Sequence, residues 1–220
     1  MTRLTEFTIR RTASGDYDAT EMVTREAFWN VYEPGCDEHY LLHVMRGSDG
    51  FIPELDLVAV RDGEVLGNIV CGRSIIETDA GGTVEVLTLG PVSVLPEFQG
   101  HGIGGALIDG VKRLASDLGF DAILLYGDPN YYRRFGFVPA ETLDIRTAND
   151  MYAEPLQVLE LRYGALDGKS GRYEENNVYE VDEQAVIEFD KQFHRKEEIE
   201  GLPSQQRSQY LLRARRPRSA

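Results

Sequence analysis

The chain has 220 residues, of which 42% are hydrophobic and 27% are charged, and its formal net charge is −14 at pH 7. This length and balance fit one substantial globular core, whereas the acidic charge argues against a nucleic-acid-binding protein, which needs a basic face. No apolar run approaches the roughly 20 residues that cross a membrane, and the first residues lack the apolar core of a signal peptide, so we expect no membrane contact and a cytoplasmic location.

The N-terminal region predicts one strand followed by two helices. Residues 7–10 alternate between apolar and polar side chains, as a half-buried strand does, and residues 14–18 form a turn with helix-capping side chains. We expect a helix over residues 19–30 and a second, short helix around residues 41–45, where apolar side chains cluster.

The middle of the chain predicts antiparallel strands. Residues 55–60 and 65–70 flank Arg61-Asp62-Gly63-Glu64, which indicates a hairpin because Asp-Gly accepts the positive φ angles of a tight turn. Further strands are expected over residues 73–77 and 84–94. Since these strands follow one another closely, they predict an antiparallel sheet.

The strand over residues 84–94 contains Gly90-Pro91, which interrupts pairing because proline has no N–H to donate. The glycine-rich stretch at residues 99–105, Gln-Gly-His-Gly-Ile-Gly-Gly, follows closely. It lacks the Lys-Ser/Thr ending of a P-loop and the spacing of a dinucleotide-binding fold. Several free N–H groups at the start of a helix favour phosphate, so the loop predicts an anion site.

A helix and a parallel strand are expected after this loop. Apolar residues recur three or four positions apart from Ile103 to Leu118, and Gly119 is a suitable stop. Residues 122–126 form a short apolar strand of the kind buried on both faces. Strand, helix and strand make a parallel crossover, and the break at Gly90-Pro91 would open a wedge between its two strands.

The remaining residues predict short elements and an extension. Residues 131–135 suit a short helix, and a strand beginning at residues 137–138 would pair with another over residues 156–161. Beyond residue 166 the composition becomes acidic, with a helix expected over residues 182–196. The last fourteen residues hold five arginines and no acid. Such a tail can lie on its own protein, bridge a subunit or stay disordered.

Two motifs resemble the GNAT superfamily of acyl-CoA N-acyltransferases. Its signature, Gln/Arg-x-x-Gly-x-Gly/Ala after a bulged strand, is matched by Gln99, Gly102 and Gly104. Residues 127–137, Gly-Asp-Pro-Asn-Tyr-Tyr-Arg-Arg-Phe-Gly-Phe, resemble a segment of a predicted bacterial N-acetyltransferase branch. The likeness covers about residues 7–165.

The resemblance implies an α/β (α+β) GNAT fold with a mixed, mostly antiparallel central sheet, one parallel splayed pair and flanking helices. We expect the N-acetyltransferase domain to span residues 1–166. Residues 167–220 would then be a C-terminal extension with a helix and a basic tail.

Acetyl-CoA is the co-substrate that the resemblance implies, and no metal is expected because the four histidines lack ligand spacing. The amides of Val92 and Val94 would pair with the pantetheine arm, and those of the glycine loop would hold the pyrophosphate. We expect His101 to be a spacer or phosphate contact rather than a catalyst. The residues expected to bind the cofactor are Val92, Ser93, Val94, Gln99, Gly100, His101, Gly102, Ile103, Gly104 and Gly105.

Acetyl transfer to an amine needs a deprotonated nucleophile, a stabilised oxyanion and a proton for the leaving thiolate. Tyr132 is the expected proton donor, since the hydroxyl at its position faces the coenzyme sulfur in the superfamily. Backbone N–H groups near Val92 are the oxyanion candidates. Glu85 is the candidate base, directly or through water, although an exposed strand glutamate is the alternative because a one-residue slip would turn it away.

The acceptor pocket of the superfamily lies beside the first two helices, which implies that Trp29, Tyr32 and His43 contact the substrate. Each is otherwise a packing or surface residue. The expected activity is acetyl transfer from acetyl-CoA to a primary amine of a small molecule or peptide by direct attack. The alternative is a non-catalytic acyl-CoA-binding sensor or interaction protein, against which Tyr132 argues. A homodimer is left open.

Overall fold

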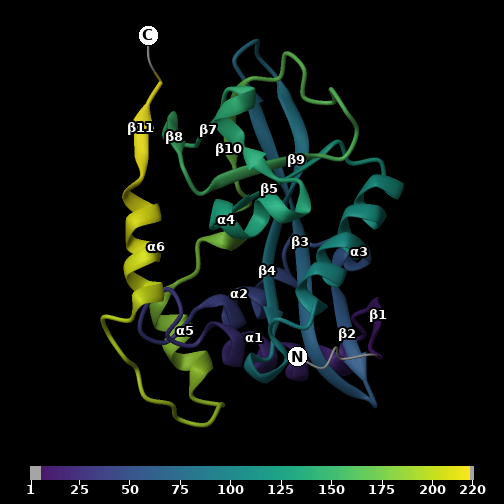
Figure 1. Ribbon diagram of the computed structural model, residues 1–220, viewed down its shortest axis with the longest axis vertical. Coiled ribbons are helices and arrows are strands. Elements are labelled where there is room, and N and C mark those ends of the chain that lie inside the picture. Colours follow the sequence, from purple (N-terminus) through teal and green to yellow (C-terminus); the bar gives the residue numbers. More distant parts are fainter. Residues whose placement is uncertain (1–5, 219–220) are drawn as a thin grey trace.

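The computed structural model describes residues 6–218, which form one large sheet with helices on both faces and a smaller two-stranded sheet (Figure 1). The large sheet has the order β1-β2-β3-β4-β5-β9-β6, and β10 pairs with both β3 and β7. The small sheet joins β8 and β11. The strands are β1 (Thr8–Arg11), β2 (Leu57–Arg61), β3 (Glu64–Thr78), β4 (Thr83–Val94), β5 (Ala122–Tyr126), β6 (Val138–Pro139), β7 (Ile145–Thr147), β8 (Met151–Ala153), β9 (Leu156–Glu160), β10 (Gly171–Glu174) and β11 (Arg215–Pro217).

Six α-helices and several 3-10 helices connect these strands in the described residues. The α-helices are α1 (Tyr17–Phe28), α2 (Glu38–Met45), α3 (Ile103–Asp117), α4 (Pro129–Tyr132), α5 (Glu183–Asp190) and α6 (Pro203–Arg213). The 3-10 helices are η1 (Ser14–Asp16), η2 (Pro53–Leu55), η3 (Pro96–Phe98), η4 (Arg133–Phe135), η5 (Ala140–Leu143) and η6 (Asn177–Tyr179). In Figure 1, α6 and β11 run along the left edge of the view, and α1, α2 and α5 gather at the lower end.

The strand pairing confirms the expected fold class. β2 and β3 form the predicted hairpin, and its turn residues Asp62 and Gly63 have φ angles of 52° and 84°. β4 and β5 are parallel and are linked by α3, as the crossover predicts. The other neighbours in the main strand order are antiparallel, and β10 and β7 form a second parallel pair.

Side-chain alternation places α3 and α1 on opposite faces of the sheet. Leu57 and Ala59 of β2 pack in the main core with apolar residues of α3. Val58, between them in sequence, packs instead with Val23 of α1. Because successive side chains of a strand point to opposite faces, the two helices cover different sides of the same strands.

Two predicted elements have different bounds in the structure. The strand expected over residues 73–77 is the second half of the continuous β3. Gly72 does not mark a turn; it allows the side chains of Tyr179 and Met45 to lie close to the backbone. A Cβ there would lie 3.2 Å from Tyr179 Oη and 3.3 Å from Met45. The helix expected over residues 182–196 ends at Asp190.

The basic tail lies on its own protein, which decides among the alternatives left open by the sequence. β11 pairs with β8, and Arg216 donates to Glu141 at 2.8 Å. Arg207 of α6 donates from Nε to Asp128 at 2.9 Å. Arginines of the basic tail therefore pair with acidic residues of the rest of the protein. A domain boundary after residue 166 stays a prediction, and β10, which follows it, pairs within the large sheet.

Candidate active site

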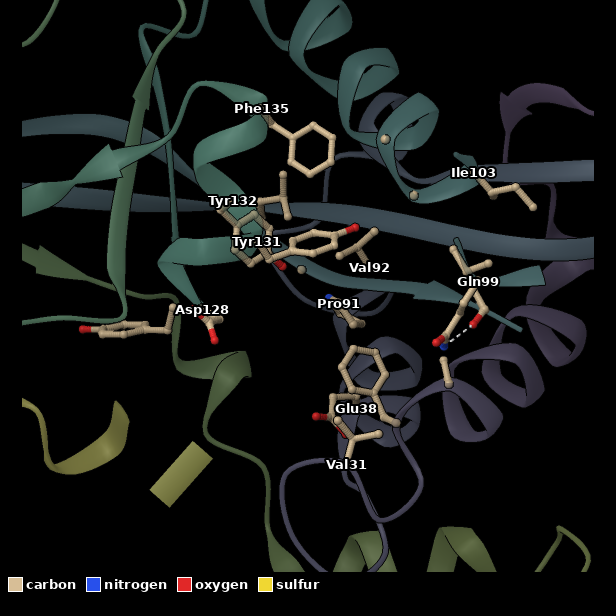
Figure 2. Close-up of a pocket in the computed structure, with 18 of the residues that line it drawn as sticks. Val31, Glu38, Pro91, Val92, Gln99, Ile103, Asp128, Tyr131, Tyr132 and Phe135 are labelled. Carbon is tan, nitrogen blue, oxygen red and sulfur yellow. Dashed lines mark hydrogen bonds between the residues drawn. The ribbon is translucent and has the colours of Figure 1, made fainter. Parts of the chain in front are cut away.

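A cavity of about 880 Å³ opens where β4 and β5 part. Figure 2 shows Tyr131 and Tyr132 of α4 facing Pro91 and Val92 of β4, with Glu38 of α2 across from them. The start of α3 and the end of α1 complete the wall. Segments expected to bind the cofactor and the acceptor therefore meet in one space.

The cavity exists because β4 extends beyond the end of its pairing with the parallel strand β5. Only Leu87 and Thr88 pair with β5, although β4 continues to Val94. On the other side, the β3–β4 register shifts between Ile69 and Cys71, as expected for a bulge near Gly90-Pro91. The free edge of β4 beyond Thr88 consequently faces the cavity instead of another strand.

The amides of Val92 and Val94 point toward this free edge. Leu95 N–H donates to Leu66 of β3 at 2.9 Å, so it points away from the cavity. Because successive N–H groups of a strand alternate between its two edges, those of Val94 and Val92 point to the cavity side. Gln99 Nε2 donates to the Val94 carbonyl at 3.1 Å and ties the glycine loop to this edge (Figure 2).

The glycine loop presents a helix N-terminus to the same cavity. Gly100 and Gly102 have φ angles of 77° and 90°, and Gly102 is the N-cap residue of α3. The next N–H groups, at the start of the fifteen-residue helix, have no carbonyl one turn before them. Together with the helix dipole these N–H groups suit an anion.

Gly104 and Gly105 allow α4 and η4 to close over this helix terminus. A Cβ on Gly104 would lie 3.1 Å from Tyr131 Oη, and one on Gly105 would lie 3.2 Å from the ring of Phe135. The aromatic side chains of the second motif thus pack directly on the glycines of the first.

Tyr132 is held by its local sequence. The Asp128 side chain caps α4 by accepting from Asn130 N–H at 2.9 Å. The ring of Tyr132 passes so close to Gly127 that a Cβ there would lie 2.3 Å away. Burial raises the pKa of the Tyr132 hydroxyl well above its usual range. The phenol therefore remains protonated at neutral pH and can donate a proton.

Most of the expected cofactor residues line the cavity, but Ser93 and His101 do not. Ser93 is fully buried and its hydroxyl donates to Thr24 of α1 at 3.0 Å, because its side chain points to the other face of the sheet. The His101 ring lies 3.0 Å from the Gln99 carbonyl and turns back onto the loop. The expected residues that line the cavity are Val92, Val94, Gln99, Gly100, Gly102, Ile103, Gly104 and Gly105.

Glu85 lies outside the cavity, which corrects its expected role as base. It pairs with Arg73, whose guanidinium lies 5.4 Å from the ring centroid of Phe120, just after the C-terminal end of α3. The glycine loop lies at the N-terminal end of the same helix, about 22 Å away at 1.5 Å per residue. The alternative of an exposed strand glutamate is therefore correct.

Of the three expected acceptor contacts, only Tyr32 lines the cavity. The Trp29 indole donates to the Glu197 carbonyl at 2.9 Å and stacks beneath Arg25, so it packs against the C-terminal segment. His43 lies 2.9 Å from Glu21 and against Phe189 of α5. Both side chains contact the C-terminal extension. The packing of this extension on α1 and α2 was not predicted from the sequence.

A second cavity of about 730 Å³ adjoins the first, and the two share Phe28, Tyr32, Glu38, Tyr126, Asp128 and Glu175 as lining residues. Its outer wall is α6. Glu38 and Glu175 were missed in the sequence because no motif contains them. Asp128 stands in the second motif, which was the one signal available for this region.

Residues 6–218 offer neither a membrane span of helical type nor a cluster of metal ligands. No helix in that range is both long and apolar enough to cross a bilayer. No group of three or more histidines, cysteines, aspartates or glutamates in it could hold a metal ion.

Comparison with known proteins gives consistent relatives. Residues 54–139 match the family model described as an acetyltransferase (GNAT) domain. The uncharacterized N-acetyltransferase YhbS of Escherichia coli K12 is 32% identical over 139 residues, which span 62% of this chain and 80% of YhbS.

Two crystal structures are similar over most of the chain. The structure of E. coli YhbS in complex with CoA aligns with a TM-score of 0.71 and 25% identity, over 80% of this chain and 92% of YhbS. A GNAT family acetyltransferase of Brucella melitensis in complex with acetyl-CoA aligns with a TM-score of 0.64 and 31% identity, over 79% of this chain and 98% of that protein.

Proposed function

This chain belongs to the GNAT family of N-acetyltransferases, and from that membership we propose that it transfers the acetyl group of acetyl-CoA directly to a primary amine of a small molecule or peptide. Family membership makes the chain an enzyme, so the alternative of a non-catalytic sensor is set aside. One observation carries the proposal: a free strand edge, a helix N-terminus and a partly buried tyrosine line one cavity.

The cofactor side of the cavity consists of Val92, Val94 and the loop from Gln99 to Gly105. We assign the pyrophosphate to the N–H groups of this loop and the pantetheine arm to the amides of Val92 and Val94. The geometry supports this because both sets of donors face one space. The two similar structures, which are complexes with CoA and with acetyl-CoA, support the same ligand.

The acceptor side is the region that the two cavities share, around Tyr32, Glu38, Tyr126 and Glu175. An amine bound here would approach the thioester from the side opposite the glycine loop. The chain's task is chiefly to hold the two reactants in line, because the thioester is already activated.

Tyr132 is the proposed proton donor to the leaving thiolate. Its hydroxyl is protonated at neutral pH because the pKa of tyrosine is ordinarily about 10, and burial raises this pKa further. The N–H of Val92 is the proposed donor to the oxyanion, since it points to the cavity where the carbonyl of the acetyl group would lie. Both groups act without a metal.

A thiol-release assay tests the proposed reaction. The protein would be mixed with acetyl-CoA and a panel of primary amines, including diamines and short peptides, and free CoA would be measured against the rate without amine. We expect at least one amine to accelerate CoA release and to be recovered as its N-acetyl product. CoA release that no amine accelerates would reject the proposed function.

A further inference from the structure

Glu175 lies where the two cavities meet. It directly follows β10 and precedes η6, and it lines both spaces. Contacts between η6 and β4 fix its position, because Tyr179 Oη lies 3.3 Å from the Thr88 and Gly90 carbonyls and donates to them. The segment bearing Glu175 is therefore fastened to the splayed part of β4.

The groups around Glu175 are mostly aromatic. Burial is the main cause that raises the pKa values of Tyr126 of β5, Tyr173 of β10 and Tyr179 of η6, and the charge of Glu175 raises them further. Glu180 is the like charge beside it, and burial followed by Glu180 raises the pKa of Glu175 to about 7.

Other charged side chains line the same two cavities, namely Glu33, Asp37, Glu38, Asp128, Arg134, Arg207 and Arg215. Asp128 is paired with Arg207, and this partner lowers the pKa of Asp128. Glu38 of α2 has a pKa well above its usual value, through burial and then the charge of Asp37. Arg215, which follows α6, lines the second cavity.

We infer that Glu175 is the general base for the acceptor, and that the acceptor is an aliphatic primary amine that is an ammonium ion in neutral solution. This inference rests on the proposed acetyl transfer. Of the carboxylates in the shared region, Asp128 is committed to Arg207 and to capping α4, and burial and then Asp37 raise the pKa of Glu38 well above its usual value. Glu175 lines both cavities on a segment fastened to the splayed part of β4, and its pKa of about 7 suits a general base.

The Glu175 carboxylate takes a proton from the ammonium group and passes it to solvent, and the neutral amine attacks the carbonyl carbon of the thioester to form a C–N bond. The tetrahedral intermediate loses its second nitrogen proton directly to solvent. The C–S bond then breaks, and the thiolate receives the Tyr132 proton. Tyr132 regains a proton from solvent, so the products are the amide, CoA thiol and one released proton.

The test compares two amines of similar size and different basicity, ethylamine and 2,2,2-trifluoroethylamine, with Glu175→Gln. Ethylamine is protonated at pH 7 and needs a base, whereas the fluorinated amine is largely neutral. We expect kcat/KM for ethylamine to fall about 100-fold or more in Glu175→Gln, and that for trifluoroethylamine to fall by less than about threefold.

Two further readouts sharpen the test. In the wild type, kcat/KM for ethylamine should rise through an apparent pKa near 7, because the base must lose its proton first, and this step should be absent in Glu175→Gln. Glu174→Gln is the matched control, since Glu174 is the preceding residue and lines neither cavity. It should change either rate by less than about twofold.

Equal losses for both amines would overturn the inference, because they indicate a structural role, and so would an unchanged ethylamine rate. Failure of the proposed function is recognised separately, as wild-type protein that acetylates no amine. In that case ¹³C NMR titration of Glu175 still decides the point, since a carboxyl that titrates near the ordinary glutamate value of about 4.3 overturns its role as base.

Discussion

The cofactor side of the cavity comes from one continuous stretch that includes β4, the glycine loop and the start of α3, whereas the acceptor side joins α1, α2, the segment around Glu175 and α6. The cofactor side is thus built from neighbouring parts of the sequence, whereas the acceptor side is built from segments that lie far apart in the sequence. A family motif can therefore encode the binding of a shared co-substrate, while the acceptor depends on which later segments fold onto the cavity. Changes on the two sides should have separable effects.

The largest effect is expected at Tyr132, where the two sides meet. Tyr132→Phe keeps the ring that packs against Gly127 and removes only the proton donor. We expect kcat to fall by about ten- to a few hundred-fold, with the affinity for CoA near that of the wild type. The measurement is steady-state kinetics together with calorimetric titration of CoA.

Tyr131→Phe is the control for this change, because Tyr131 is the adjacent ring of the same helix and its hydroxyl lies over Gly104. It should reduce kcat much less. An unchanged kcat in Tyr132→Phe, measured where chemistry limits turnover, would assign the proton donor to water or another hydroxyl.

The next largest effect is expected on the cofactor side. In Gly104→Val the new side chain meets Tyr131 Oη and the Val94 side chain, at 3.1 and 3.7 Å from its Cβ. Overpacking of this kind costs about 1–3 kcal/mol, so CoA affinity should weaken roughly ten- to a hundred-fold. Calorimetry with Gly15→Val as control checks this, since a Cβ on Gly15 meets no atom within 4 Å. Undiminished affinity would remove the loop as the pyrophosphate site.

The smallest effect is expected on the acceptor side at Arg207. Its guanidinium bonds Asp128, the N-cap residue of the helix that carries Tyr132. The pair is partly exposed and worth at most about 1 kcal/mol, so Arg207→Ala should lower kcat by no more than about fivefold. CoA affinity should stay constant, and Arg207→Lys should recover part of the loss. A loss of CoA affinity instead would show that α6 supports the cofactor side.

The same contrast explains what the sequence could predict. Gln99, Gly102 and Gly104 follow one another in a pattern whose chemistry depends on backbone N–H groups, so their place in the cavity followed from order alone. Strand alternation also predicted that Val92 and Val94 share one face of β4. It could not fix position along the sheet, so Glu85 was placed on a plausible strand but at the wrong end of α3.

Contacts between distant segments carry no such local signal. Trp29 was expected at the acceptor but is covered by the backbone of Glu197, 168 residues away in the sequence. Glu175 follows β10, which pairs with β3 on one edge and with β7 on the other. The residues next to Glu175 in the sequence do not predict that pairing. Acidic residues are common in the C-terminal extension. Only the tertiary fold shows which of them reaches the cavity.

We expect the pairing of β10 with β3 to form late in folding. Arg172 bonds Glu77 across 95 positions of sequence, whereas β4, α3 and β5 are successive elements. Loops that long close slowly because the entropy of closure is lost before the contacts form. Refolding from denaturant should therefore restore CoA binding before it restores transferase activity, a delay that stopped-flow binding and activity measurements would detect.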